Sequence, residues 1–192
     1  MPDNPGLYIG VGVVCLLLTL VVFWLVATYN KLVRQRNQVQ ASWAQIDVQL
    51  KRRYDLIPNL VETVKGYAAH ERGTLEAVVR ARTEAIAAAD QGPDVRAGAE
   101  NVLTQTLGRL FALAEAYPDL KANDTFAALQ AELTSTEDKI SYARQFFNSA
   151  VQTLNTSVQT VPAALVAGMF GFRVMRYFEA GEAERGPVQV RF

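Results

Sequence analysis

The sequence feature that most constrains this chain is an uncharged, apolar run from Leu7 to Thr28. Its 22 residues include the segment VGVVCLLLTLVVFWLVA. About 20 apolar residues carry an α-helix across a hydrocarbon core of about 30 Å. The run therefore predicts a transmembrane helix over residues 7–28, preceded by a short external N-terminus, residues 1–6.

A cleaved secretory signal is the competing interpretation of this run. Such a signal has a basic start, an apolar core of about 7–15 residues and a cleavage site of the small-x-small type. Here the first residues, MPDNPG, contain no Lys or Arg, the apolar run is longer, and VATYN is a poor cleavage site. The pattern favours a permanent anchor.

The flanking charges predict the orientation of the anchor. Lys31, Arg34 and Arg36 follow the apolar run, whereas no Lys or Arg precedes it. Positively charged flanks stay on the cytoplasmic side of a membrane. We therefore expect a single-pass protein with its N-terminus outside and residues 29–192 in the cytoplasm.

Beyond the anchor, larger apolar residues recur at steps of three and four, as on the buried face of an α-helix. The first stripe passes through Pro58 without losing phase, which predicts a bend there with helix on both sides. Because proline lacks an N–H, the carbonyl of Tyr54 must be satisfied by a neighbouring polar group or by water. The stripe consists of Val39, Trp43, Ile46, Leu50, Tyr54, Ile57, Leu60 or Val61, Val64 and Tyr67.

Three further helical patterns follow. Residues 74–89 carry a short stripe, interpreted as continuous with the first helix or loosely joined to it: Leu75, Val78, Val79, Arg82 and Ile86. After a loop signal at 90–94, with Asp94 as the expected N-cap, the next stripe is Val95, Ala99, Val102, Thr106, Leu110, Leu113 and Tyr117. The last pattern covers 124–161, capped by Asn123 or Asp124 and ended by Pro162, with Ile140, Phe147 and Leu154 among its expected core residues.

These patterns predict an all-α protein: an N-terminal transmembrane helix followed by a cytoplasmic, antiparallel bundle of long helices over residues 29–161. Long helices with one apolar stripe bury it against one another in this way. The C-terminal run PVQVRF alternates like a strand but has no partner, so we interpret it as a tail.

The composition argues against most enzymatic chemistry. The single cysteine, Cys15, lies inside the apolar run, and the single histidine, His70, has no second ligand nearby. No phosphate-binding, dinucleotide-binding, nucleophile-elbow or zinc-protease motif is present. The 19 basic and 19 acidic residues balance, which is unlike a nucleic-acid-binding protein. We therefore expect no catalytic residue, metal, cofactor, nucleic acid or small-molecule substrate.

Two rows of polar residues are candidates for an interaction seam. One lies on residues 45–67 and the other on the last long helix, and each recurs at helical steps. They are either solvated faces with pairs inside each helix or a polar seam between helices or subunits. The residues are Asp47, Lys51, Arg52, Asp55, Asn59 and Glu62 in the first row, with Glu137, Arg144 and Asn148 in the second.

The C-terminal part, residues 162–192, begins with a strongly apolar segment that is too short to be a second span. Its aromatic residues are a candidate docking segment: Phe170, Phe172, Tyr177 and Phe178. They could cover the end of the bundle, enter the membrane or bind a partner. If residues 74–89 continue the first helix, the order of helix directions places this segment at the membrane-distal end.

The run QASWAQIDVQLKRRYDLIPNLVETVKGYAAHE at 40–71 closely resembles the signature of the LemA family of bacterial membrane proteins. YNKLVRQRN, YPDLKAN, LTSTEDKISYARQFFN and FGF…YFEA extend the resemblance along most of the chain. It implies a single span in the bacterial inner membrane with a cytoplasmic helical bundle, and it attaches no enzymatic activity. The family includes a magnetosome-membrane protein, and its genes often neighbour membrane-embedded zinc metalloproteases of the HtpX kind.

Two functional hypotheses follow. The first is a non-enzymatic, membrane-anchored scaffold or adaptor that self-assembles or binds another membrane protein, with a quality-control protease as one candidate. The second is a membrane-shaping or membrane-organising oligomer, which would use a basic amphipathic face. Both expect the lipid bilayer and a protein partner or a homo-oligomer as the binding partners.

Overall fold

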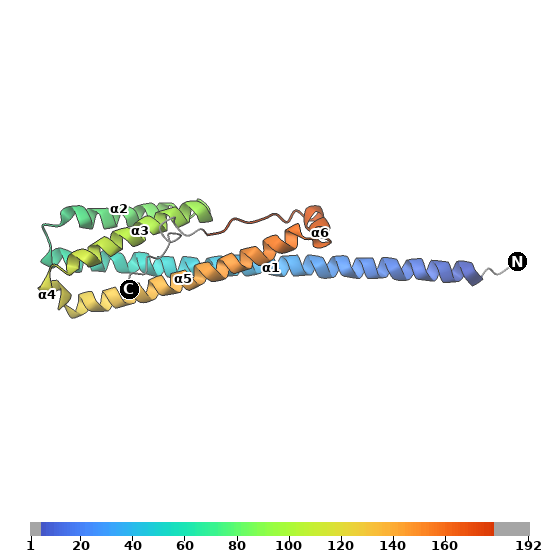
Figure 1. Cartoon of the computed structure of the whole chain (residues 1–192), viewed down its shortest axis with the longest axis horizontal. Coiled ribbons are helices and arrows are strands. Elements are labelled where there is room, and N and C mark those ends of the chain that lie inside the picture. Colours follow the sequence, from blue (N-terminus) through green and yellow to red (C-terminus); the bar gives the residue numbers. More distant parts are fainter. Residues whose placement is uncertain (1–4, 179–192) are drawn as a thin grey trace, which may run out of the picture. The chain divides into compact units, whose positions relative to one another are not determined.

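A computed structural model describes residues 5–178 (Figure 1), and among these every regular element is a helix. The all-α prediction is confirmed. In chain order the elements are α1 (Pro5–Tyr67), α2 (Arg72–Ala87), α3 (Pro93–Ala114), α4 (Pro118–Lys121), α5 (Asp124–Gln159) and α6 (Ala163–Met169). The run PVQVRF lies outside the described residues.

Helix α1 is long because nothing ends it between the apolar run and Tyr67. By length and composition it is the one helix in the described part of the chain that could cross a membrane. The most apolar part of this helix is not buried against any other described part of the protein. A helix that is apolar all round and has no protein partner requires lipid or another chain around it.

Pro58 lies inside α1, with helix on both sides, as predicted. The carbonyl of Tyr54, four residues earlier, cannot accept the usual helical hydrogen bond. The Nε of Arg82 on α2 donates to this oxygen instead, at 2.8 Å. The expectation that a neighbouring polar group satisfies Tyr54 is therefore confirmed.

The described residues fall into two compact units. The bundle unit contains residues 42–149 and 176–178, and the apolar unit contains residues 5–41 and 150–175. Helices α1 and α5 contribute residues to both.

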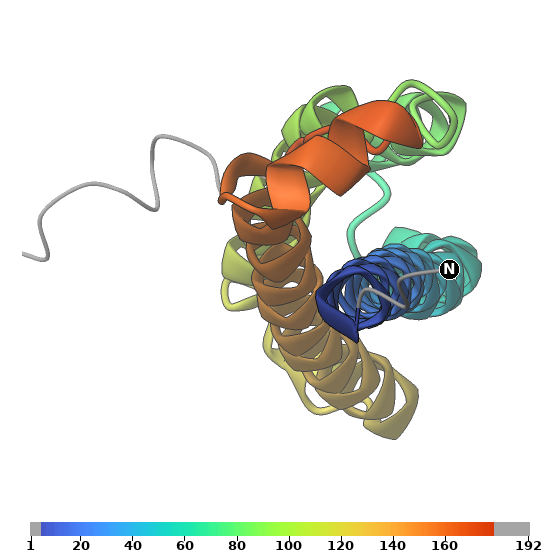
Figure 2. The ribbon, with the colours of Figure 1, turned by 90° about the vertical axis from the view of Figure 1, so that its right-hand side faces the viewer.

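Side-chain contacts define the helix directions in the bundle unit. Arg96 and Thr104 of α3 meet Asp47 and Arg53 of α1 in the same order along the chain, so α3 runs parallel to α1. The contact of Trp43 with Phe147 and that of Arg52 with Glu132 occur in opposite order, so α5 is antiparallel to α1. Figure 2 views these helices end-on.

The first helical stripe is largely correct: its members from Val39 to Val64 are buried, except that Trp43 is half-buried. Tyr67 at its end is exposed. Ile140, Phe147 and Leu154 of α5 are buried as expected.

The stripe expected for α3 is partly wrong. Val95 and Val102 are exposed, whereas the buried row is Arg96, Ala97, Glu100, Leu103, Thr106, Leu107, Leu110 and Ala114. In α2, Val79 and Ile86 are also exposed, and the smaller Ala81 and Ala85 are buried beside Leu75 and Val78. Buried charges and alanines concealed these core faces from hydrophobic periodicity.

The interpretation of residues 74–89 as a continuation of the first helix is wrong. The helix stops at Tyr67, and α2 folds back beside α1, as the Arg82–Tyr54 contact requires. Folding back buries Leu75 and Val78, which a straight continuation would leave without a partner.

The helix caps differ in part from the expectation. The Oδ1 of Asn123 accepts the N–H of Phe126 at 2.9 Å, so Asn123 caps α5 as proposed. Asp94 is not the cap of α3; it lies in the first turn, after Gly92 at the N-cap position and Pro93. Gly92 has a φ of 96°, which a glycine adopts without strain.

In the apolar unit, helix α6 and the residues after it pack beside α1. The N–H of Phe172 donates to the carbonyl of Ala167 at 2.9 Å, and Gly171 between them has a φ of 72°. This is the usual way in which a glycine terminates a helix. It turns the chain so that the rings of Phe170 and Phe172 lie 4.8 Å and 5.9 Å from the ring of Tyr29.

The membrane-distal placement of the aromatic segment is therefore wrong. Tyr29 is the first residue after the apolar run, so Phe170 and Phe172 lie where that run ends. The error follows from the incorrect continuation of α1 into residues 74–89.

Candidate functional site

The centre of the bundle unit contains a buried guanidinium. Arg53 of α1 is only 2% exposed, and its Nη1 lies 3.4 Å from the Oε2 of Glu100 and 3.1 Å from the Oε2 of Glu137. Its Nη2 donates to the Oγ1 of Thr104 at 2.7 Å. A buried arginine requires such partners because an unpaired charge in a protein interior is very costly.

Tyr54, the next residue, donates its hydroxyl proton to Glu100 from the same turn of α1. Burial raises the pKa of Glu100, and the hydrogen bond from Tyr54 and the charge of Arg53 oppose that shift. Burial, followed by the bond to Glu100 and its charge, raises the pKa of Tyr54 as well. The tyrosine is therefore a permanent proton donor at physiological pH.

A second ion pair lies one helical turn toward the N-terminal end of α3. Arg96 is 4% exposed and pairs with Asp47 of α1. The guanidinium carbon of Arg96 also lies 5.2 Å from the centre of the Trp43 ring, a cation–π distance. Both arginines thus join α1 to α3.

These groups have the character of a structural network. Each charge is partnered by a fixed side chain, and the described residues 5–178 contain no group of three His, Cys, Asp or Glu residues suited to a metal ion. His70 is exposed, and Cys15 is exposed in the apolar run. The network can order helices, but it does not pair a nucleophile with a base.

Several of the predicted seam residues meet across helices. Asp47 pairs with Arg96, Arg52 pairs with Glu132, and Glu137 pairs with Arg53. Others do not: Glu62 pairs with Lys65 within α1 at 3.5 Å, whereas Lys51, Asp55 and Asn59 have exposed side chains.

Asn148 and Arg144 of α5 hold the chain's own C-terminal segment. The Oδ1 of Asn148 accepts the N–H of Phe178 at 2.8 Å, and its Nδ2 donates to the carbonyl of Phe178 at 2.9 Å. Phe178 is 2% exposed, with Trp43 and the guanidinium of Arg144 against its ring. Tyr177, also predicted to dock, remains 38% exposed.

In the apolar unit, Asn155 makes the same pair of hydrogen bonds to the backbone of Met175, at 2.8 and 2.9 Å. The seven-residue spacing places Asn148 and Asn155 on one side of α5. A carboxamide that both donates to and accepts from one residue recognises an extended backbone, whatever its side chain.

Sequence reasoning missed Arg53, Glu100 and Arg96 as members of the site. Arg53 lies within a run of three basic residues, which is ordinarily a solvated face. One signal was available: Glu100 stands seven residues before Leu107, at a core position of α3, and is followed on that face by Leu103. An acid in such a row requires a basic partner on a facing helix.

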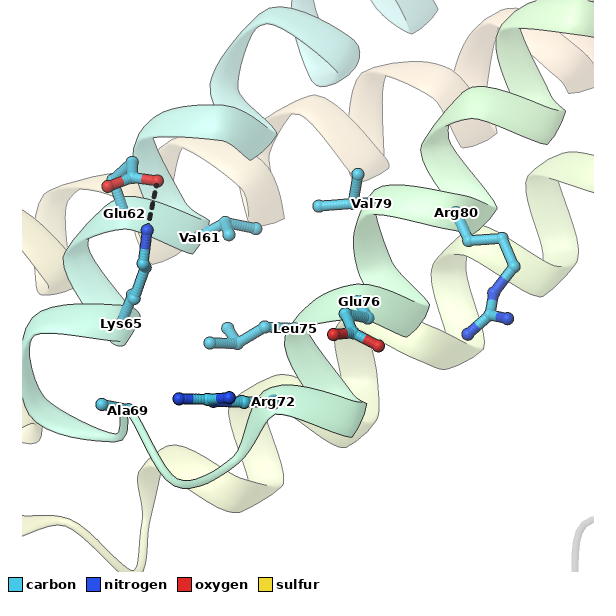
Figure 3. A pocket seen from close by; sticks show the side chains of 9 residues that line it. All are labelled: Val61, Glu62, Lys65, Ala69, Arg72, Leu75, Glu76, Val79 and Arg80. Carbon is cyan, nitrogen blue, oxygen red and sulfur yellow. Dashed lines mark ion pairs between the residues drawn. The ribbon is translucent and has the colours of Figure 1, made fainter.

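The bundle unit has a hollow between the end of α1 and the start of α2, with a volume of about 760 Å³. Figure 3 shows Val61 and Leu75 pointing into it, with the Glu62–Lys65 pair at one side. Its rim also contains Arg72, Glu76 and Arg80.

A second groove, of about 680 Å³, runs between α1 and α5. Its apolar side chains remain accessible: Tyr142 is 72% exposed, Val48 63% and Phe146 48%. In the same groove the Oε1 of Gln49 is buried without a hydrogen-bond partner among the described residues. Exposed aromatics beside an unsatisfied acceptor are typical of a protein-binding surface.

Comparison with known proteins identifies the family. Residues 42–192 match the LemA family. The chain is 28% identical over 210 residues to magnetosome protein MamQ of Magnetospirillum gryphiswaldense, covering 93% of this chain and 77% of that protein. It is 28% identical over 188 residues to magnetosome protein MamQ 2 of Paramagnetospirillum magneticum (85% and 69%). It is 25% identical over 171 residues to protein LemA of Metamycoplasma hominis (88% and 78%).

Proposed function

The chain belongs to the LemA family, and we propose that it is a non-enzymatic, membrane-anchored scaffold that binds another membrane protein or a second copy of itself. The observation that carries this proposal is the α1–α5 groove. Tyr142, Phe146 and Val48 are exposed there beside the unsatisfied oxygen of Gln49. Aromatic residues on a rigid helical face are the usual anchors of protein interfaces.

The polar interior supports a scaffold in preference to an enzyme. Arg53 and Glu100 are held by fixed partners inside the bundle. Their ion pairs and hydrogen bonds therefore serve to fix the helices relative to one another. A rigid bundle presents surface residues with little loss of conformational entropy on binding.

Photo-crosslinking of the full-length protein in a mild detergent tests the groove. A benzophenone amino acid replaces Tyr142 in one sample and Val102 of α3, 48% exposed, in the matched control. We expect one adduct of defined mass from position 142 and none from position 102. An adduct of twice the chain mass indicates self-assembly, and another mass indicates an adaptor. Absence of an adduct at position 142 would refute the α1–α5 groove as a protein-binding surface.

We further propose that the membrane is the bacterial inner membrane, with residues 29–192 in the cytoplasm. Lys31, Arg34 and Arg36 at one end of the apolar run support this orientation. A phosphatase reporter that is active only outside the membrane, fused after Phe192, should be silent. Full activity of that fusion would reverse the orientation.

A membrane-organising oligomer is the second candidate. The described part of the apolar unit has four basic and no acidic residues, which supports this candidate because such a surface is attracted to anionic lipid. Electron microscopy of liposomes containing the purified protein distinguishes the two functions: tubulation by a homo-oligomer supports membrane shaping, and unchanged vesicles support the scaffold.

A further inference from the structure

Helix α6 and the residues after it expose a continuous apolar surface in the apolar unit. Val166 and Ala167 face inward, while Leu165 is 65% exposed and Met169 is 72% exposed. Leu165 and Met169 are four residues apart and therefore lie on the same side of the helix. Phe170 and Val174 continue this surface, at 55% and 54% exposure.

The position of this surface along α1 is set by ring contacts. Phe170 lies 4.8 Å from Tyr29, and Phe172 lies 5.9 Å from it. Tyr29 follows the apolar run directly. A helix rises about 1.5 Å per residue, so Tyr29 lies at the boundary between hydrocarbon and headgroups if the run spans a bilayer. The exposed side chains of α6 are attached at that same depth.

The charges of the apolar unit favour an anionic neighbour. Its described residues include Lys31, Arg34, Arg36 and Arg173 and contain no Asp or Glu. The guanidinium carbon of Arg36 lies 5.3 Å from the centre of the Phe172 ring. A positive charge therefore lies beside the aromatic rings that contact Tyr29. An apolar face flanked by basic residues is the pattern of a helix that lies in the interface of an anionic membrane.

We propose that α6 and residues 170–174 form a second membrane contact, which lies in the interface of an anionic bilayer at the point where α1 leaves it. The occupant of this surface is lipid because the surface adjoins the end of the apolar run and the charged residues described in this unit are all basic. The chain would thus hold the membrane by one spanning and one interfacial element. This inference rests on the membrane span of the proposed function.

Depth-dependent quenching tests the contact in the full-length protein. Single cysteines replace Leu165 or Met169 in a Cys15→Ser background and carry an environment-sensitive fluorophore. The protein is reconstituted into vesicles of phosphatidylcholine and phosphatidylglycerol with nitroxide-labelled lipids. Matched labels at Leu18, inside the apolar run, and at Tyr142, 72% exposed in the bundle unit, serve as the two references.

We expect labels at positions 165 and 169 to be quenched at least threefold more than the label at position 142. We also expect this quenching to weaken at least twofold when phosphatidylcholine replaces the anionic lipid. If position 18 is quenched but positions 165 and 169 behave like position 142, the interfacial contact is wrong and the span stands. If position 18 is not quenched, the span of the proposed function fails, and the contact fails with it. Quenching that does not depend on the anionic lipid would refute the proposed preference of this contact for an anionic bilayer.

Discussion

The bundle unit and the apolar unit differ in which charged residues they contain and in how those residues are paired. The bundle unit has 13 basic and 15 acidic residues among those described, and it brings Arg53, Arg96 and Glu100 into its interior. The described residues of the apolar unit, 5–41 and 150–175, include no acidic residue, so its basic side chains have no carboxylate among them to pair with. The bundle unit pairs its buried charges internally, whereas the described residues of the apolar unit offer no carboxylate to its basic side chains.

This difference shows why the two units impose different demands on a sequence. A buried ion network requires particular partners on several helices, because removal of one leaves the other unpaired. An apolar surface against lipid requires only hydrophobicity and a flanking charge of the right sign. The stability of the bundle unit should therefore depend on single polar residues much more than that of the apolar unit.

Among these variants, Arg53→Ala should lower the free energy of unfolding the most. A small effect would contradict the proposed dependence of the bundle unit on single polar residues. It leaves Glu100 buried without its cationic partner, which should cost about 3–5 kcal/mol of unfolding free energy. Lys65→Ala removes an exposed pair and should change stability by less than about 1 kcal/mol. Denaturation of the full-length protein in detergent, followed by circular dichroism, measures both. Equal effects would show that the buried network does not stabilise the bundle.

The Arg82–Tyr54 contact gives the next largest effect. Arg82→Ala leaves a buried helix carbonyl unsatisfied and should cost about 1–3 kcal/mol. In a Pro58→Ala background the restored N–H at position 58 can donate to Tyr54, so the same substitution should cost less. A double-mutant cycle measures this coupling. Additive effects would mean that Arg82 does not compensate for the proline.

Asn148 and Asn155 allow a matched test in the two units. Each alanine substitution removes two hydrogen bonds to an extended backbone, worth about 1–2 kcal/mol together. Asn148→Ala should have the larger effect because it also loosens the buried Phe178, whereas Met175 is 38% exposed. Amide hydrogen exchange resolved by peptide should rise around residues 176–178 for Asn148→Ala and around residues 172–175 for Asn155→Ala. Asn148→Asp, which keeps the acceptor, should be intermediate; identical exchange in all variants would contradict the assignment.

Glu100→Gln tests the pH dependence of stability in the same network, because it replaces a titratable carboxyl group with a neutral amide. Burial holds the pKa of Glu100 above its ordinary value of 4.5 in the folded protein. Its contribution to stability is therefore fully present below that ordinary value and is lost as pH rises through the raised folded pKa. Relative to the parent, the Gln variant should gain stability as the pH rises from the ordinary glutamate pKa through the raised pKa of folded Glu100. Melting temperatures at each pH measure the difference, and a constant difference would contradict the raised pKa.

Sequence periodicity succeeded where one residue class dominates a helix face. The stripe from Val39 to Val64 and the core residues of α5 were identified because large apolar side chains recur there. It failed for α3, where Arg96 and Glu100 occupy core positions and Val95 and Val102 are exposed. A periodic pattern cannot distinguish a buried pair from two solvated charges, because the partner lies on another helix.

Only some residues of the predicted polar seam have partners on another helix. Asp47, Arg52 and Glu137 meet partners across helices, but their neighbours Lys51, Asp55 and Asn59 remain exposed on the same helix. A shift of one residue along α1 rotates a side chain by about 100° around the helix axis. The facing helices, and not the residue types, determine which side chains pair.

The sequence alone determined the apolar run, the all-helical class, the continuity of helix through Pro58 and the resemblance to the LemA family, because each depends on residues close together in the chain. Only the tertiary structure decided that α2 folds back beside α1 and that Phe170 and Phe172 lie against Tyr29. It also decided that Arg53, Glu100 and Glu137 share one site. The direction of a chain after a turn is selected by the burial of distant apolar faces, a collective energy that no local pattern records.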